Sequence, residues 1–107
     1  MDAHRFAVLN ARASILKAMA HPARLLILEE LARREHCVAE LTEMAGLDVS
    51  TVSKHLSRLK DAGLVTGERR GAQVYYSLRV PCVLNFFGCV EAVMQSTAEE
   101  HQKLTQQ

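Results

Sequence analysis

The three cysteines of this 107-residue chain, Cys37, Cys82 and Cys89, carry its most distinctive chemistry. Thiolates are soft ligands, and they select soft or borderline ions such as arsenite, antimonite, cadmium, copper(I) or zinc. A site with three thiols would suit trivalent arsenic, whose lone pair favours three ligands. The structural interpretation is that each cysteine fills a gap as a small apolar residue, because free cysteine is among the most buried residue types.

The spacing of the thiols restricts how they could share an ion. In one regular helix, Cys82 and Cys89 would lie on the same face but about 10 Å apart along the axis, at ~1.5 Å per residue. One ion cannot bridge that separation, because thiolates bind a metal such as zinc at about 2.3 Å. A shared site therefore requires Cys82 to fold back from an irregular segment before the helix, with Cys37 as the candidate third ligand. Otherwise each thiol pairs with a different group.

Hydroxyl and cationic side chains recur at helical spacing within residues 49–61. One side of the expected helix is apolar, with Val49, Val52, Leu56 and Leu59. The other side carries a polar track at positions i, i+3, i+4 and i+7, which is Thr51, Lys54, His55 and Arg58. Such side chains can reach phosphate oxygens and base edges in a major groove, and an ordinary solvated face is the alternative. The predicted DNA contacts on this helix are Ser50, Thr51, Ser53, Lys54, His55 and Arg58.

The residues before this helix predict a helix-turn-helix. Val38, Leu41 and Met44 recur at helical spacing, and Gly46 follows where a left-handed residue commonly ends a helix. Asp48 is then well placed to cap the second helix. We therefore expect two short helices joined by a tight turn.

A β-hairpin with a basic tip is predicted directly after these helices. Residues 64–66 are apolar, residues 67–71 are expected to form a charged turn, and residues 73–78 are rich in strand formers. A hairpin at this position makes a wing, and its Arg69 and Arg70 are predicted affinity contacts to a flanking phosphate or minor groove. The alternative is a surface hairpin whose arginines only keep it soluble.

Three further helices complete the predicted fold. The first runs from about His4 to Met19 and must end before Pro22, which suits the first turn of a second helix. Pro81 suits the start of a final helix that continues to about Thr97. The apolar band of this final helix is too wide for one small domain to cover. We therefore expect a homodimer through the first and last helices, with a core helix in a monomer as the alternative.

Composition limits the class of protein. With 107 residues, of which 49% are hydrophobic and 23% charged, the chain is expected to form one folded domain over residues 1–107. The net charge is only +1, but basic residues gather between Lys54 and Arg70, and this local charge matters more than the sum. No signal peptide pattern or membrane-spanning segment is recognisable, so we expect a cytoplasmic protein without a membrane partner, whose cysteines remain thiols.

Five segments occur here in a specific order, namely HPARLLIL at residues 21–28, CVAEL at 37–41, STVSKHL at 50–56, LKDAGLV at 59–65 and YYSL at 75–78. In these segments the chain resembles the ArsR/SmtB family of bacterial repressors over essentially its whole length. The resemblance implies a mainly α winged helix-turn-helix fold with a β-hairpin wing. It also implies a homodimer that occupies operator DNA until an inducer, commonly a metal or metalloid ion, lowers its DNA affinity.

The resemblance does not fix the inducer. In arsenical repressors of this family the segment at Cys37 usually reads Cys-Val-Cys, and here the second cysteine is replaced by Ala39. The zinc pair that other members carry on the last helix is matched here only at Cys82. We therefore predict a soft ion, with trivalent arsenic first, bound by Cys37, Cys82 and Cys89.

Two other functions compete with ion sensing. Cys37 could form a reversible disulfide or polysulfide bridge with Cys82 or Cys89, as in family members that sense oxidants or reactive sulfur. A thiol enzyme or metal-buffering protein is the remote alternative, with His36 as a base beside Cys37. No Gly-rich loop, acid pair or nucleophile motif accompanies these residues, so we expect no enzyme.

Overall fold

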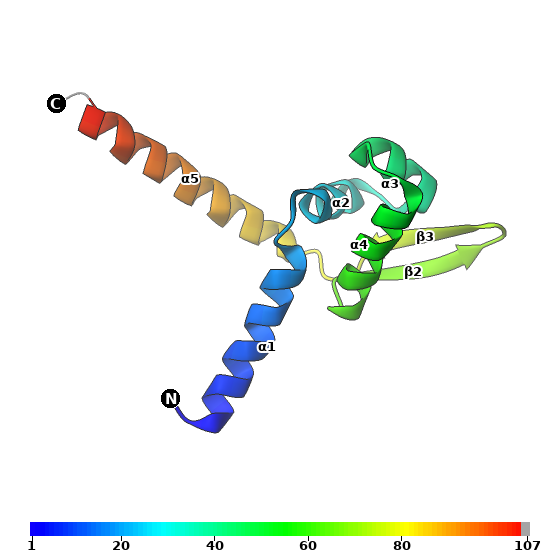
Figure 1. The fold of residues 1–107 in the computed structure, drawn as a ribbon, viewed down its shortest axis with the longest axis horizontal. Helices are drawn as coiled ribbons and strands as arrows, with labels where there is room; N and C mark the ends of the chain where they lie inside the picture. The colour runs from blue at the N-terminus through cyan, green and yellow to red at the C-terminus, as the bar shows by residue number, and fades with distance from the viewer. Residues whose placement is uncertain (106–107) are drawn as a thin grey trace.

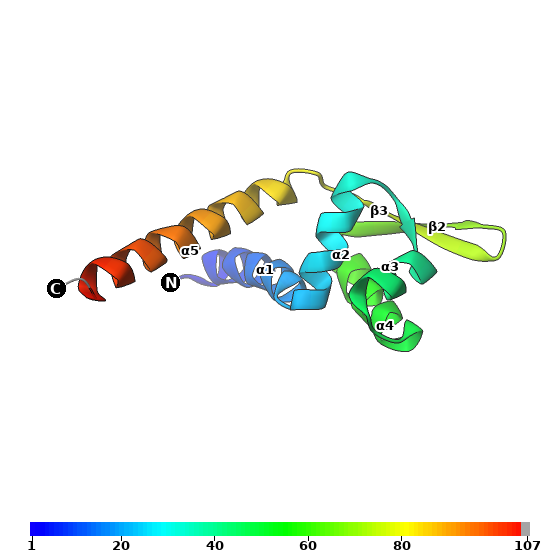
Figure 2. The same ribbon diagram turned by 90° about the horizontal axis from the view of Figure 1, so that it is seen from above.

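Five helices and one three-stranded sheet make up the computed structural model of the chain, which describes residues 1–105 (Figure 1). In chain order the elements are α1 (Ala3–Met19), α2 (Pro22–Arg33), β1 (His36–Cys37), α3 (Val38–Ala45), α4 (Val49–Asp61), β2 (Val65–Arg70), β3 (Gln73–Leu78) and α5 (Val83–Thr105). Helices α2, α3 and α4 form a head with the sheet, and α1 and α5 project from this head in different directions (Figures 1 and 2). The predicted winged helix-turn-helix is confirmed.

Capping side chains and a proline set the limits of the first two helices. Asp2 precedes α1, and its carboxylate accepts a hydrogen bond from the backbone N–H of Arg5 at 2.7 Å. His21 precedes α2, and its Nδ1 accepts a hydrogen bond from the backbone N–H of Ala23 at 3.0 Å. Pro22 is the first residue of α2, where its missing N–H costs no helical hydrogen bond. The predicted break before Pro22 is confirmed.

Helices α3 and α4 meet at a turn that Gly46 and Asp48 define. Gly46 has a φ of 66°, and its N–H donates to the carbonyls of Thr42 at 3.1 Å and Glu43 at 3.3 Å. Glycine adopts this left-handed conformation without steric cost. Asp48 caps α4 by accepting a hydrogen bond from the backbone N–H of Thr51 at 2.7 Å. Both predicted roles are confirmed.

The sheet has the order β1-β3-β2, and both pairs of neighbours are antiparallel. Strands β2 and β3 form the wing, with Arg70 opposite Gln73 at its tip. The short strand β1, which sequence patterns do not predict, pairs with the other edge of β3 and sets Cys37 opposite Tyr75. The wing is therefore attached to the segment that links α2 to α3.

The predicted position of the wing turn is wrong in detail. The expected charged turn at residues 67–71 is mostly the end of β2, and the chain reverses at Gly71, whose φ is 64°. Arg69 and Arg70 consequently lie on a strand, and their side chains alternate between its two faces. Cys37 is both the last residue of β1 and the residue that caps the N-terminus of α3.

The core of the head holds α4 in a fixed rotation. Its fully buried aliphatic side chains include Ile27, Leu28, Leu41, Val52, Leu56 and Leu59. Burial of each such side chain contributes about 1.5–3 kcal/mol to the stability of the folded state. Val49 was expected on the same apolar side, but it is 58% exposed, because the core ends at Val52 and Val49 only begins the helix.

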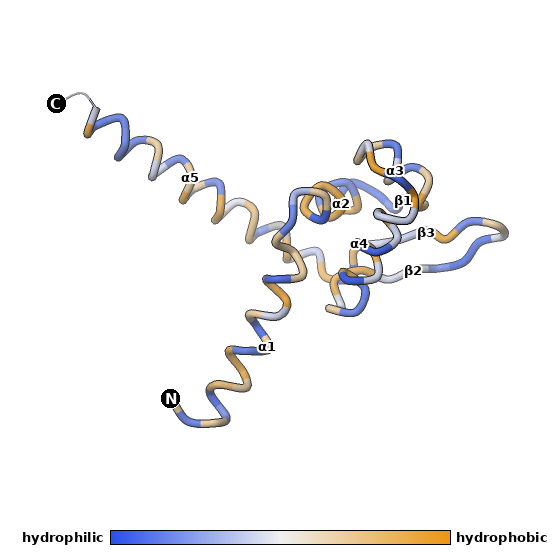
Figure 3. The backbone as a smooth tube through the Cα atoms, viewed as in Figure 1, coloured by the Kyte–Doolittle hydropathy of each residue, from blue (hydrophilic) through white to orange (hydrophobic). Residues whose placement is uncertain are grey.

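Helices α1 and α5 leave much apolar surface uncovered. In α1 the buried residues are Ala18 and Met19, both at its C-terminal end. Large apolar side chains that stay exposed are Phe6, Leu9, Ile15 and Leu16 on α1, and Phe86, Val90, Val93, Met94 and Leu104 on α5. Apolar positions recur along both helices in Figure 3. Within residues 1–105, no helix combines the length and apolar character needed to cross a bilayer.

Candidate nucleic-acid interface

The polar track of α4 faces away from the core of the head. Ser53, Lys54 and Arg58 are exposed, whereas Thr51 and His55 are half-buried. Because the buried side chains of α4 fix its rotation, hydroxyl, amine and guanidinium groups share one solvent-facing surface. These groups can donate to phosphate oxygens and to the acceptor edges of bases.

Ser50 takes part in the cap of α4. Its Oγ donates to Oδ1 of Asp48 at 2.8 Å, and the same oxygen accepts the backbone N–H of Thr51. The hydrogen bond from the Thr51 backbone, followed by that from Ser50, lowers the pKa of Asp48 below its usual range. The hydroxyl proton of Ser50 is therefore engaged, and its oxygen keeps the capacity to accept a hydrogen bond.

His55 lies against the N-terminus of α2, an arrangement that the sequence patterns did not predict. The ring centroids of His55 and His21 are 4.5 Å apart, with 42° between the ring planes. Burial, followed by the charges of His21, Arg24 and Arg58, lowers the pKa of His55. Arg24 is 8% exposed, and its pKa is lowered by burial and then by the charge of Arg58. His21 and Arg24 belong to the HPAR segment, but no local signal indicates that they meet α4.

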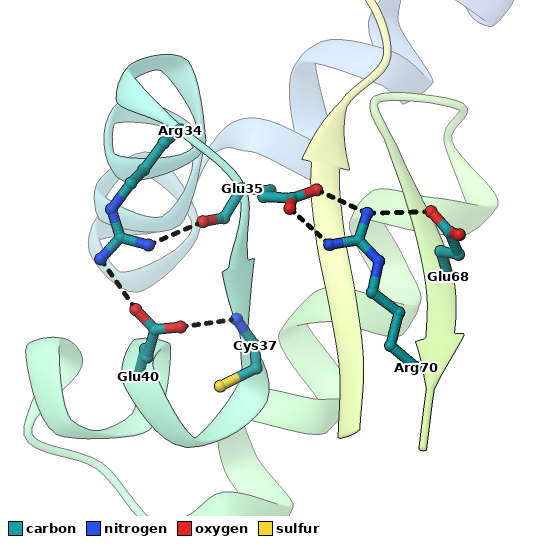
Figure 4. Close-up of polar contacts among 6 residues, drawn as sticks. All are labelled: Arg34, Glu35, Cys37, Glu40, Glu68 and Arg70. Atoms are coloured by element: carbon teal, nitrogen blue, oxygen red, sulfur yellow. Dashed lines mark hydrogen bonds and ion pairs between the residues drawn. The ribbon is translucent and has the colours of Figure 1, made fainter. Parts of the chain in front are cut away.

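The two wing arginines differ in their surroundings (Figure 4). The guanidinium of Arg70 binds both carboxylate oxygens of Glu35, at 2.5 Å and 3.0 Å, and one oxygen of Glu68 at 3.1 Å. It also lies 5.0 Å from the centre of the Tyr75 ring. These bonds, that to Glu35 first, raise the pKa of Arg70 above its usual range, and the Arg70 guanidinium lowers the pKa of Glu35. Arg69 makes a long hydrogen bond of 3.5 Å to the Gly71 carbonyl.

A second polar group surrounds Cys37, between α2 and α3 (Figure 4). Oε2 of Glu40 accepts a hydrogen bond from Arg34 at 2.9 Å and lies 3.1 Å from Nδ1 of His36, while Oε1 accepts the backbone N–H of Cys37 at 3.3 Å. The hydrogen bond with His36, followed by that from Arg34, lowers the pKa of Glu40 to about 2. Glu40 therefore remains a carboxylate that holds the backbone N–H of Cys37 and the side chains of Arg34 and His36.

The three thiols lie in different surroundings. Cys37 is 6% exposed, whereas Cys82 and Cys89 are exposed, and all three are free cysteines. Cys82 lies in the turn before α5, where its carbonyl accepts the backbone N–H of Asn85 at 3.0 Å. Residues 1–105 of one chain form no group of three or more histidine, cysteine, aspartate or glutamate side chains that could hold a metal ion. The predicted set of Cys37, Cys82 and Cys89 is therefore not assembled within one chain.

Comparison with known families and proteins gives a consistent result. Residues 21–66 match the family described as bacterial regulatory protein, arsR family. The chain is 42% identical over 71 residues to the HTH-type transcriptional repressor SmtB of Mycobacterium tuberculosis, which is 66% of this chain and 53% of that protein. It is also 40% identical over 81 residues to the nodulation protein NolR of Rhizobium meliloti, which is 76% of this chain and 66% of that protein. The matches thus span about half to two thirds of these relatives.

Solved structures resemble the whole fold. The crystal structure of NolR from Sinorhizobium fredii aligns with a TM-score of 0.80 at 33% identity, over 87% of this chain and 93% of that one. The homodimeric winged helix-turn-helix DNA-binding domain Mb0332 from Mycobacterium bovis aligns with a TM-score of 0.78 at 32% identity, over 94% of this chain and 93% of that one. SmtB is named a transcriptional repressor and Mb0332 a DNA-binding domain, in agreement with the expectation of a DNA-binding protein.

Proposed function

Because this chain belongs to the ArsR family of bacterial regulatory proteins, we propose that it is a transcriptional repressor that binds double-stranded operator DNA. The observation that carries the proposal is the solvent-facing surface of α4, where Ser53, Lys54 and Arg58 stand clear of the core. A single helix of this kind fits the major groove of B-form DNA, which is about 12 Å wide.

The arrangement of the head supports a binding mode for each element. The first turns of α4 carry Ser50, Thr51, Ser53 and Lys54, which would reach base edges, as recognition helices do with their N-terminal residues. The wing would follow the flanking backbone, where Arg69 neutralises a phosphate. Arg70 has a different part in this proposal, because its ion pair with Glu35 ties the wing to the end of α2.

Duplex selection tests the proposed function. Purified protein is used to select binding duplexes from a randomised pool, and the affinity of a selected duplex is then measured by fluorescence anisotropy. We expect an inverted repeat whose half-sites are one helical turn or a multiple apart. Lys54→Ala should weaken binding, while Lys103→Ala, the same change on exposed α5, should not. Failure to enrich any duplex would reject the repressor function.

A homodimer is part of the proposal, with α1 and α5 of the two copies packed together. It is supported by the exposed apolar side chains of these two helices and by the homodimeric state of the Mb0332 domain. An isologous interface of this kind buries the same patch on each subunit and sets the two α4 helices at a fixed separation.

We assign the inducer to soft ions that bind thiolates, with trivalent arsenic first and antimonite, cadmium, copper(I) and zinc as the other candidates. Within one chain the buried Cys37 and the exposed Cys82 and Cys89 do not form a ligand set. A dimer through α5 would bring the thiols of a second copy toward Cys82 and Cys89. We therefore assign the ion site to the dimer, so that ion binding changes the separation of the two α4 helices.

Arsenite titration under strict reduction tests this assignment. A fluorescent duplex complex should dissociate on addition of arsenite. Cys82→Ser and Cys89→Ser should each abolish the response without changing DNA affinity in the absence of arsenite. Retention of the response in both variants would exclude a shared site on α5.

A second candidate is thiol oxidation, in which Cys37 forms a bridge with Cys82 or Cys89, and the exposure of these last two thiols favours it. A disulfide or polysulfide bridge needs only two accessible sulfurs, whereas an arsenic site needs three ligands. In this case DNA is released by an oxidant or a polysulfide and recovered with dithiothreitol, and arsenite has no effect under reduction.

A further inference from the structure

Four nitrogen-bearing side chains gather where the N-terminus of α2 meets α4, and we call them the α2–α4 cluster: His21, Arg24, His55 and Arg58. The imidazole rings of His21 and His55 lie 4.5 Å apart between centroids, with their planes tilted by 42°. The charges of Arg24 and Arg58 both act on His55, and Arg58 acts on Arg24. The cluster therefore concentrates positive charge at a helix N-terminus, which is itself positive because of the helix dipole.

Arg24 gives an independent indication that the cluster lacks a partner. Its side chain is 8% exposed, and its Nε is fully buried without a hydrogen bond. Among residues 1–105, no carboxylate forms an ion pair with Arg24, His21, His55 or Arg58. Buried charged groups in folded proteins are normally paired, since an unpaired one is costly. An anion that approaches the cluster would supply the negative charge that these side chains lack.

We propose that the α2–α4 cluster is a binding site for one backbone phosphate of the DNA duplex. This inference rests on the proposed repressor function, and it adds His21 and Arg24 to the DNA-binding surface. It also moves His55 and Arg58 from base recognition to backbone contact. The phosphate lies beside the first turn of α2, where the side chains of the cluster supply the contacts, because the backbone N–H of Ala23 is already bonded to His21 and Pro22 has none.

The position of the cluster on the head favours duplex phosphate over a free ion. His55 and Arg58 belong to the same polar track as Lys54, so a duplex that reaches Lys54 also passes the cluster. Arg58 also lines a hollow with Lys17 of α1 and Asp61 of α4, so the surface next to the cluster carries charges of both signs. Free inorganic phosphate binds the same cluster far more weakly, because it lacks the neighbouring contacts that a duplex makes.

Proton uptake follows from this assignment. Burial disfavours the protonated form of His55 most, followed by the charges of His21 and Arg24 on α2 and of Arg58 on α4. The negative charge of a bound phosphate favours the protonated form of His55. DNA binding therefore takes up a proton at this residue. DNA affinity should then rise as the pH falls from about 8 to about 6, by up to about tenfold per pH unit for each proton taken up.

Salt dependence of DNA affinity is the first test. Arg24→Met keeps the aliphatic stem and removes the charge, and Arg33→Met removes an equal charge at the exposed other end of α2. Arg24→Met should lower the slope of log affinity against log salt by about one per subunit, equally for a selected and a mixed-sequence duplex. Arg33→Met should leave the slope unchanged. His55→Gln should keep DNA binding and remove the pH dependence.

Neutral methylphosphonate linkages identify the phosphate without relying on the folding of a variant. One linkage at a time is neutralised in a selected duplex, and wild-type affinity should fall at one position in each half-site facing α2. Arg24→Met should be insensitive at that position and sensitive at all others. Inorganic phosphate at equal concentration should not compete.

Two results together would reject the phosphate site and leave the repressor function standing. In these results the wild type binds duplex yet no linkage depends on Arg24, and His55→Gln keeps the pH dependence of DNA affinity. If the wild type binds no duplex, both are rejected.

Discussion

Glu40 is the residue that most strongly orders the segment around the Cys37 thiol. Its carboxylate bonds to Arg34, to His36 and to the backbone of Cys37, so that α2, β1 and α3 are tied together at one side chain. Because Cys37 also pairs with Tyr75 of β3, this junction is continuous with the wing. A chemical change at the thiol would therefore act on the backbone that holds β3.

Replacement of Glu40 tests this junction through the pH dependence of stability. The pKa of Glu40 is lowered to about 2 from its ordinary 4.5, so its ionised form stabilises the folded state above pH 4.5. That contribution is lost as the pH falls from 4.5 to about 2. Glu40→Gln should lower the Tm by a few degrees at neutral pH, and the difference from wild type should shrink toward pH 2. Glu43→Gln, at an exposed site of α3, serves as the control. A pH-independent difference for Glu40→Gln would contradict this assignment.

Arg69 and Arg70 are neighbours with different expected effects on DNA affinity. The charge of Arg70 is already shared with Glu35 and Glu68, whereas Arg69 makes one long hydrogen bond to a carbonyl. Arg69→Ala should therefore weaken all duplexes alike and lower the salt slope by about one, and Arg70→Ala should lower it by less. Since the Arg70 ion pair with Glu35 is largely exposed, its loss should change the Tm little. Equal salt slopes in the two variants would show that Arg70 breaks its ion pairs with Glu35 and Glu68 when the protein binds DNA.

At the scale of elements, α4 depends on its cap. The first turn of α4 carries Ser50 and Thr51, and Asp48 binds both by hydrogen bonds. Loss of the cap would fray the turn that carries the proposed base contacts, because the backbone N–H of Thr51 has no other intrahelical acceptor.

Two substitutions of Asp48 separate capping from charge. Asp48→Ala should lower the Tm by a few degrees and weaken sequence-specific binding, whereas Asp48→Asn should retain most of both, since asparagine caps helices nearly as well. Thermal unfolding and the affinity ratio of selected to mixed-sequence duplex are the measurements. Comparable losses in both variants would assign the effect to the carboxylate charge.

Elements with local signals were predictable from the sequence, and pairings between distant segments were not. Gly46, Asp48 and Pro22 act through their own backbone or the next few residues, so the helix limits they set follow from sequence alone. The strand β1 has only two residues and exists because it pairs with β3, some forty residues away. No periodicity of side chains can indicate a strand of that length.

The candidate site divides in the same way. The exposure of Lys54 follows from the helical period of α4, which the sequence contains. The ion pair of Arg70 with Glu35 joins residues 35 positions apart, and the contact of His21 with His55 depends on how α2 packs on α4. Likewise, the separation of the buried Cys37 from the exposed thiols depends on the direction in which α5 leaves the head.

At the scale of the whole molecule, the chain is too extended for an isolated globule. Its radius of gyration is 17.1 Å, whereas a globular domain of this length has about 13 Å. The excess comes from α1 and α5, which project from the head with exposed Phe6, Phe86 and Val93 (Figures 1 and 3). Exposed apolar surface on two long helices is typical of an interaction surface, and a second copy of the chain can cover both.

Charged substitutions on this surface separate assembly from folding. Phe6 is 60% exposed and Val93 is 65% exposed in the single chain, so Phe6→Glu and Val93→Glu should leave the fold intact. In a dimer each would bury a charge against apolar side chains, and we expect a shift to monomer by analytical ultracentrifugation with far-ultraviolet circular dichroism unchanged. Operator affinity should fall at least tenfold at subunit concentrations where the wild type is dimeric, since the two half-sites would be bound independently.

Met44→Glu places the same charge on a 42% exposed apolar position of α3 and should remain dimeric. If both helix variants remain dimeric, the dimer interface does not lie on α1 and α5. The apolar faces of these helices would then bind another partner.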